Sequence, residues 1–294
     1  MAFCIITDSA SDVPESTKEK YGLHVIPTPV IIDDVDYFDR ETVFPEDFYR
    51  YQAEGRKIST YHVSQAMFMD CFRAYAERGD EVLYICFSTG IAGTFQAATL
   101  AKQDIVEEFP DFKITIIDSK CASIGYGLVV DKLLQMQKNG APKELIIEAA
   151  EYFCRHMKHI VTVDSLDYLY KGGRISKTSA VMGGMLDIKP VIIVNEEGAL
   201  VATEKVRGWK KVIKRMLEIV ATKGADVTKQ IIGIAYGASR DSIVPVEKTL
   251  IEDMHVKGIL ETQVGCAIGA HTGPTIIGIV YQDEINEKYD RYLD

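Results

Sequence analysis

The regular alternation of short apolar runs with helix-like segments constrains the fold of this chain more than any other feature. Strand-like runs lie at 3–6, 25–32, 82–87 and 114–117, and helical patterns lie at 14–21, 45–51, 64–77 and 95–107. Such alternation predicts an α/β fold with a mainly parallel sheet and helices on both faces. We therefore expect a Rossmann-like N-terminal domain, with ligands at the carboxyl ends of its strands.

The pattern changes after two further predicted helices at 126–138 and 142–156. Strand-like runs follow at 160–163, 191–194, 199–203, 231–236, 258–264 and 275–281, with a helical pattern at 242–252. The segment 195–198 ends in Gly198, which can adopt a positive φ and favours a hairpin. We predict a second α/β domain with a mixed sheet. The proposed domains are residues 1–160 and 161–294, with the ligand between them.

Composition excludes several classes of function. The formal net charge is -10 and the basic residues are dispersed, which argues against a nucleic-acid partner. No apolar run reaches the roughly 18 residues of a membrane span, and the first residues do not resemble a signal peptide. The six cysteines show neither CxxC spacing nor histidines at metal-ligand intervals. We expect a cytoplasmic protein with no integral membrane segment, no metal and no disulfide framework.

Residues 88–94 form a glycine-containing loop between a predicted strand and a predicted helix. The first turn of a helix has free N–H groups and partial positive charge, so the junction favours an anion. The loop lacks the lysine of a P-loop and the full GxGxxG spacing, which disfavours a nucleoside triphosphate. The alternative is a tight turn in which Gly90 and Gly93 serve only the backbone geometry.

Three other polar segments have both a functional and a structural interpretation. Asp8 follows the first strand and could supply a catalytic carboxylate, although helix capping would select the same residue. Thr60 and His62 precede a helix whose predicted cap is Ser64, so this segment by itself is a helix entry. His271 lies in a predicted loop at 269–274, where it could donate to a carboxylate or be satisfied by the main chain.

Two arginines stand beside glycines in predicted loops. Arg174 follows Gly173, and Arg207 precedes Gly208. Either guanidinium could hold an anion through two hydrogen bonds or mark a docking face. The alternative for both is an ordinary solvated arginine. The chain contains neither a nucleophile elbow nor an HExxH helix, so the sequence has no clear signature of catalysis.

Seven ordered segments across the whole chain resemble the motifs of the DegV family of bacterial fatty-acid-binding proteins. They are Thr7-Asp8-Ser9, residues 88–94, Asp118-Ser119 with Gly125 and Gly127, residues 169–176, Lys189-Pro190, residues 205–208 and residues 271–274. The resemblance implies a non-catalytic carrier that buries a long acyl chain and holds its carboxylate for a separate fatty acid kinase. It also implies a place in phospholipid metabolism, transient membrane contact and no cofactor besides the bound fatty acid.

The resemblance also implies which residues contact the ligand. The expected carboxylate site is Thr60, Ser88, Thr89, Gly90, Ala92, Gly93 and His271. Arg174 and Arg207 match arginines of the family's kinase-docking or head-group regions. Three positions depart from the family pattern: Tyr61-His62 replaces Ser-Gln, Ala92 replaces a serine, and Thr275 replaces a glycine.

Physical chemistry favours a carboxylate ligand over a polyphosphate. A helix N-terminus with neutral donors suits a single negative charge, whereas polyphosphates usually need lysine or Mg²⁺. Two alternatives remain open from the sequence. One is a hydrolase or phosphoryl-transfer enzyme that uses Asp8, Ser88 and His271 on an acyl substrate. The other is a carrier of a different apolar anion, because Tyr61 and His62 could reshape the head-group pocket.

Overall fold

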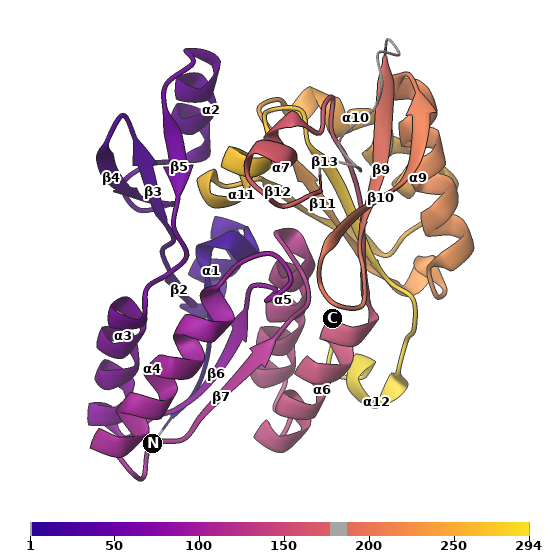
Figure 1. The fold of residues 1–294 in the computed structure, drawn as a ribbon. Helices are drawn as coiled ribbons and strands as arrows, with labels where there is room; N and C mark the ends of the chain where they lie inside the picture. Colours follow the sequence, from indigo (N-terminus) through magenta and orange to yellow (C-terminus); the bar gives the residue numbers. More distant parts are fainter. Residues whose placement is uncertain (1, 177–186, 294) are drawn as a thin grey trace.

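The computed structural model describes residues 2–176 and 187–293. Its N-terminal part contains a four-stranded parallel sheet with the order β2-β1-β6-β7, seen at the lower left of Figure 1. The strands are β1 (Phe3–Asp8), β2 (His24–Ile26), β6 (Glu81–Cys86) and β7 (Ile114–Asp118). The predicted Rossmann-like parallel sheet is confirmed.

Helices cover both faces of this sheet. One face carries α3 (Gln65–Arg78) and α4 (Thr94–Glu108), and the other carries α1 (Glu15–Tyr21), α5 (Ile124–Lys138) and α6 (Lys143–His156). The predicted cap of α3 is confirmed, because the Ser64 hydroxyl accepts a hydrogen bond from the N–H of Met67 at 3.2 Å. Phe68, Phe72 and Tyr84 are buried where α3 meets the sheet.

The second half of the chain builds a six-stranded sheet with the order β10-β9-β8-β13-β11-β12. Its strands are β8 (Met157–Thr162), β9 (Ile188–Val194), β10 (Leu200–Arg207), β11 (Ile231–Tyr236), β12 (Gly258–Gln263) and β13 (Ile277–Gln282). Only β11 and β12 pair in parallel, and the other neighbours are antiparallel. The predicted mixed sheet and its β9–β10 hairpin, with Gly198 at φ 80°, are confirmed.

Helix α9 (Trp209–Lys223) covers the outer face of the mixed sheet together with α10 (Val244–Lys248). The predicted helix at 242–252 is instead a succession of three short pieces. These are a 3₁₀ turn at Arg240–Ile243, α10, and a π-helical turn at Thr249–Asp253. Further helices are α7 (Asp167–Lys171), α11 (Cys266–Thr272) and α12 (Glu287–Asp290), and short 3₁₀ turns lie at Ser9–Ser11 and Val227–Lys229.

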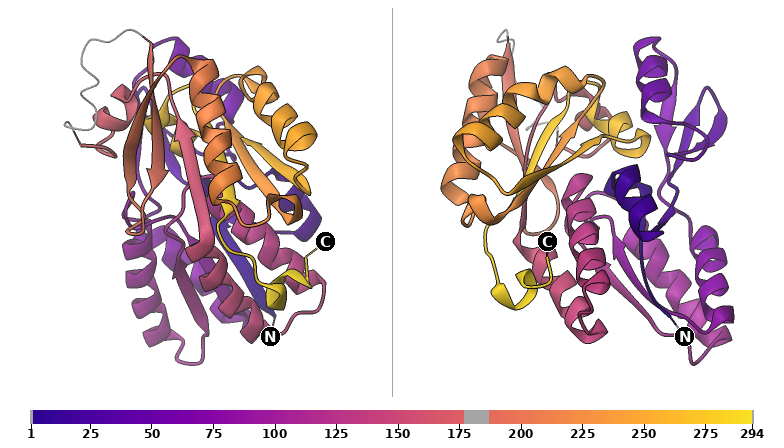
Figure 2. Two further views of the ribbon diagram at one scale, coloured as in Figure 1. Left: turned by 90° about the vertical axis from the view of Figure 1, so that its right-hand side faces the viewer. Right: turned by 180° about the vertical axis from the view of Figure 1, so that it is seen from behind.

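A small three-stranded sheet corrects one prediction. The run 25–32 is not one strand, because Pro27 and Pro29 lack the N–H groups that would continue the parallel ladder. After β2 the chain leaves the parallel sheet as β3 (Pro29–Ile32), which pairs antiparallel with β4 (Val35–Phe38) and β5 (Ile58–Thr60). With α2 (Pro45–Ala53), these strands form a β3–β5 subdomain that stands beside α11 (Figures 1 and 2).

Helix α5 lies between the two large sheets. Every residue of α5 from Ile124 to Met136 is buried, including the polar side chains of Asp131 and Lys132. The helix contacts β1 and β6 of the parallel sheet and β8, β11, β12 and β13 of the mixed sheet. One apolar core therefore continues from one sheet to the other. The proposed division at residue 160 falls within β8.

Candidate functional site

A cavity lies where the glycine loop after β6, the start of α5, the mixed sheet and the β3–β5 subdomain meet. It encloses about 970 Å³ when its open mouth is included. The wall is mostly aliphatic and aromatic, with side chains such as Phe87, Ile91, Ile124, Leu169, Ile192 and Val280. The cavity can therefore accept an extended apolar ligand.

Three polar side chains meet on one part of this wall. Thr60 is the last residue of β5, and its Oγ1 lies 2.7 Å from Nε2 of His271 on α11. Arg174 follows α7 and lines the same cavity. The predicted loop at 269–274 is wrong in part, because α11 continues through Thr272 and ends at Gly273, whose φ is 78°. Thus His271 is positioned by a helix, which holds its ring more firmly than a loop would.

Burial controls the charge of these groups. Desolvation, together with a smaller effect of the nearby positive charge of Arg174, lowers the pKa of His271 from about 6.5 to about 4. The His271 ring is therefore neutral at pH 7. Burial also lowers the pKa of Arg174, whose Nη1 donates to the carbonyl of Gly172. No carboxylate among the described residues pairs with Arg174, so a half-buried cation faces the cavity without a counter-ion.

Gly172 makes this arrangement possible. A Cβ on Gly172 would lie 2.3 Å from Nδ1 of His271, far inside van der Waals contact. Since Gly172 belongs to the turn after α7 and His271 to α11, the absence of a side chain lets the two elements pack closely. The segment around Arg174 thus has two roles: Arg174 supplies a guanidinium, and Gly172 leaves room for the ring of His271.

The glycine loop at 88–94 divides into two parts. Ile91, Ala92 and Thr94 line the cavity, and Gly93 caps α4 with the His62 ring packed against it. The first part of the loop lies outside the cavity wall. The hydroxyl of Ser88 is buried and donates to the carbonyl of Gly198 in the β9–β10 hairpin at 2.8 Å.

Thr89 and Gly90 also lie outside the cavity wall. The N–H of Thr89 donates to Oδ1 of Asp118 at 3.1 Å. A Cβ on Gly90 would lie 2.5 Å from the carbonyl carbon of Gly198, so this glycine permits the loop to contact the hairpin. Ser88 and Gly90 therefore join the two large sheets, and the structure does not bring Ser88, Thr89 or Gly90 to the Thr60–His271 pair.

Asp8 and Arg207 are also away from the cavity wall. The Asp8 carboxylate is buried beneath the loops and accepts hydrogen bonds from the hydroxyls of Tyr84 and Tyr126 at 2.7 and 2.6 Å. Burial raises the pKa of Asp8, and these hydrogen bonds oppose that rise. Arg207 is exposed at the end of β10. The structure therefore does not assemble Asp8, Ser88 and His271 into one group.

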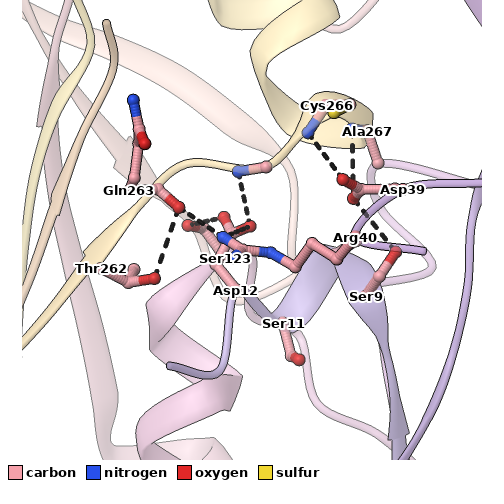
Figure 3. Close-up of polar contacts among 12 residues, drawn as sticks. Ser9, Ser11, Asp12, Asp39, Arg40, Ser123, Thr262, Gln263, Cys266 and Ala267 are labelled. Atoms are coloured by element: carbon pink, nitrogen blue, oxygen red, sulfur yellow. Dashed lines mark hydrogen bonds and ion pairs between the residues drawn. The ribbon is translucent and has the colours of Figure 1, made fainter. Parts of the chain in front are cut away.

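The first turn of α11 is held by a buried polar cluster that sequence reasoning missed. Oδ1 of Asp39 accepts the N–H of Cys266 at 2.9 Å, and Oδ1 of Asp12 accepts the N–H of Gly265 at 2.7 Å. Arg40 lies between the two carboxylates and donates to Asp12 at 3.3 Å. Figure 3 shows that these side chains converge from the N-terminal part of the chain onto the start of α11.

Burial makes this cluster electrostatically strained. Desolvation, helped by the negative charge of Asp39, raises the pKa of Asp12 to about 6, although the nearby Arg40 and the hydroxyl of Ser123 oppose the rise. Asp12 and Arg40 also adopt positive φ values of 50° and 62°. No local spacing links these residues to α11, which follows more than two hundred positions later, so only the tertiary contacts reveal them.

Within residues 2–176 and 187–293, no group of three or more His, Cys, Asp or Glu side chains is arranged to hold a metal ion. None of the described helices combines the length and apolarity needed to cross a bilayer. All six cysteines are free thiols.

Comparison with known proteins identifies close relatives over nearly the whole chain. A family model described as an uncharacterised protein of the DegV family matches residues 2–284. A DegV domain-containing protein of Caldanaerobacter subterraneus subsp. tengcongensis is 34% identical over 280 residues, which cover 95% of this chain and 98% of the relative.

Solved structures show the same architecture. A fatty-acid-binding DegV family protein from Thermus thermophilus has a TM-score of 0.86 and 27% identity, covering 96% of this chain and 100% of the other. A stearic-acid-binding protein from Eubacterium ventriosum has a TM-score of 0.86 and 26% identity, covering 98% and 99%. Both were described as binding fatty acids, and both share the two-sheet fold of this chain.

Proposed function

The chain belongs to the DegV family, and we propose that it binds a long-chain fatty acid in the cavity and holds the carboxylate for phosphorylation by a separate fatty acid kinase. The carboxylate rests near Thr60, His271 and Arg174. The acyl chain extends along the apolar wall between the glycine loop, the start of α5 and the mixed sheet. The single observation that carries this proposal is a half-buried arginine that pairs with no carboxylate of residues 2–176 and 187–293, in a cavity whose wall is mostly apolar.

The charges of the site suit one carboxylate. Arg174 supplies a single positive charge, while Thr60 and the neutral His271 supply hydrogen bonds. A carboxylate near His271 favours the protonated ring, because an opposite charge raises the pKa of a histidine. Ala92 brings a methyl group to the cavity where the family commonly has a serine, so Arg174 carries more of the head-group recognition in this chain.

The acyl chain provides most of the binding free energy. Each buried methylene contributes roughly 0.8 kcal/mol, so a chain of about sixteen carbons supplies a gross transfer free energy near 12 kcal/mol before association costs. The cavity wall offers apolar side chains from both large sheets. Few polar contacts are therefore needed for tight binding.

The kinase partnership and the location are part of the same proposal. A carrier that presents a carboxylate needs a docking face near the mouth of its cavity, and an exposed arginine on that face would pair with acidic groups of a partner. Arg207 is exposed at the end of β10, which supports a docking role rather than ligand contact. We place the protein in the cytoplasm, with transient membrane contact when fatty acid is exchanged.

Mass spectrometry tests the ligand. Protein purified from bacterial cells is measured under native conditions before and after extraction with organic solvent. We expect extraction to remove a mass that matches a long-chain fatty acid, and stearate added afterwards should restore that mass. Protein that neither carries nor takes up a fatty acid would refute the proposal.

A coupled assay tests the kinase role. The protein loaded with fatty acid is incubated with a bacterial fatty acid kinase and ATP, and acyl phosphate is detected as its hydroxamate. We expect acyl phosphate only when kinase and loaded protein are both present, and Arg207→Ala should lower the rate without changing fatty-acid affinity. Acyl phosphate formed without the kinase would instead favour the enzymatic alternative.

A further inference from the structure

His159 places a polar ring within the apolar wall of the cavity. It lies on β8, is only 4% exposed, and lines the cavity with its same-face neighbour Val161. Its Nε2 contacts the main chain of Ala122, at 3.3 Å from the nitrogen and 3.2 Å from the oxygen. Its Nδ1 is buried and has no hydrogen-bond partner within the described parts of the chain.

The contacts of Ala122 determine which nitrogen carries the proton. The Ala122 carbonyl already accepts the N–H of Gly125 at 3.0 Å, whereas the Ala122 N–H has the His159 ring as its acceptor. This pattern assigns Nε2 as the acceptor and leaves the hydrogen on Nδ1. Burial lowers the pKa of His159 to about 4, so the ring is neutral at pH 7. Nδ1 of His159 is therefore a buried N–H donor in a cavity-lining residue, and no described residue accepts its hydrogen bond.

His159 lies away from the carboxylate end of the proposed ligand. The chain enters β13 soon after His271, so the start of β13 is nearest the head group. His159 pairs with Val280, three residues beyond Ile277 at the start of the strand. At a rise of roughly 3.3 Å per residue, this places His159 about 10 Å farther along the sheet. A ligand oxygen at that depth belongs to the middle of an acyl chain.

We propose that the cavity prefers a long-chain fatty acid with an oxygen in the middle of its chain, as a hydroxyl or keto group, and that Nδ1 of His159 donates a hydrogen bond to that oxygen. This inference rests on the proposed fatty-acid function and specifies its substrate class. An unpaired buried donor disfavours a plain hydrocarbon, since burying a polar group without a partner costs free energy. An oxygenated chain supplies the missing acceptor beside His159.

A ligand series with the unmodified protein provides the first test. Dissociation constants are measured by calorimetry for stearate, 10-hydroxystearate, 12-hydroxystearate and 3-hydroxystearate. We expect at least one mid-chain hydroxy acid to bind as tightly as stearate or more tightly, and 3-hydroxystearate to bind more weakly than stearate. If both mid-chain hydroxy acids bind about tenfold more weakly than stearate, the inference is wrong.

Variants identify the residue responsible. His159→Leu should reduce the affinity for the preferred hydroxy acid relative to stearate by about tenfold, a change typical of one buried hydrogen bond. The ratio of the two constants is compared within each protein, so a general loss of stability cancels. Val161→Ala is the control, because it enlarges the cavity next to His159 without removing a donor and should leave the ratio unchanged.

The outcomes separate this inference from the proposed function. If stearate binds normally and His159→Leu leaves the ratio unchanged, Nδ1 of His159 does not contact the ligand and only the inference fails. If no fatty acid binds, the proposed function fails as well. A ¹⁵N spectrum gives a direct readout: the Nδ1 resonance of His159 should shift with the preferred hydroxy acid and not with stearate.

Discussion

At the scale of single residues, burial sets the charge of His271. The unfolded chain binds a proton at His271 near pH 6.5, whereas the folded protein does so only near pH 4. Between these values the unfolded state holds more protons, so this histidine stabilises the fold above pH 6.5 and its contribution is lost as the pH falls toward 4. His159 acts in the same direction, because its pKa is also lowered to about 4.

This charge state can be measured directly. A ¹⁵N NMR titration of the ligand-free protein should show His271 neutral down to about pH 5, with a midpoint near pH 4. Adding stearate should raise the midpoint, because a nearby carboxylate favours the protonated ring. His271→Asn assigns the signal. A midpoint near 6.5 in the free protein would show that the ring is not desolvated as the structure indicates.

Thr60 and Ser59 are adjacent on β5 but differ in what they contact. The Thr60 hydroxyl meets His271, whereas Ser59 is exposed. Thr60→Val should weaken stearate binding by roughly 1 kcal/mol, about fivefold, because one hydrogen bond to the head-group cluster is lost. Ser59→Ala is the control and should leave the affinity unchanged. Equal affinities in the two variants, measured by calorimetry, would argue against a head group at Thr60.

At the scale of elements, α11 is a short helix whose position depends on carboxylates from another part of the chain. Asp39 is 1% exposed and accepts hydrogen bonds from the hydroxyl of Ser9 at 3.1 Å and from the first turn of α11. Since His271 lies near the other end of α11, Asp39 controls the ring's position from a distance. It is a positioning residue and does not line the cavity.

Removing this anchor should affect both stability and binding. Asp39→Ala leaves buried N–H groups without acceptors, so we expect the free energy of unfolding to fall by about 2–4 kcal/mol and stearate affinity to weaken. The control is Asn286→Ala, which removes the cap of α12, where Oδ1 of Asn286 accepts the N–H of Lys288 at 3.1 Å. That change should cost about 1 kcal/mol and leave affinity unaltered. Denaturant titrations and calorimetry measure both quantities, and unchanged affinity in Asp39→Ala would contradict the positioning role.

Several elements were predictable because local patterns dominate their formation. The strands β6 and β11 follow continuous apolar runs, and α3 begins at its predicted cap. Other elements were missed or divided. The amphipathic segment Trp209–Lys223 was absent from the predicted helices, although its buried residues Val212, Met216 and Val220 recur at helical spacing. The predicted strand at 25–32 is divided in the structure because its prolines have no N–H group to donate to a β-ladder. These prolines are a local signal, but the apolar character of the run concealed it.

At the scale of the whole molecule, α5 couples the two sheets. It is buried along most of its length and belongs to a core that includes Leu83 of the parallel sheet and Val280 of the mixed sheet. The Ser88–Gly198 hydrogen bond adds a second connection between the two halves. If either sheet separated from α5, the side of α5 that this sheet covers would become exposed.

We therefore expect the two halves to unfold in one transition. Fluorescence of Trp209, the single tryptophan, reports on the mixed-sheet half, whereas far-UV circular dichroism reports on the whole chain. The two melting curves should coincide, as two-state behaviour requires. Stearate at a hundred times its dissociation constant should stabilise the protein by about 2.7 kcal/mol and shift both curves together. Separate transitions would show that α5 does not couple the halves.

The sequence by itself determined the α/β class and the parallel and mixed sheets, because these depend on patterns within short windows. It also identified Thr60, Arg174 and His271 as candidates through the family resemblance. Only the tertiary structure decided that Ser88, Thr89 and Gly90 lie outside the cavity wall, that Asp12 and Asp39 hold α11, and that Nδ1 of His159 has no partner among the described residues. Those facts depend on contacts between distant segments, and no local pattern of residues encodes the partner that a buried polar group will meet.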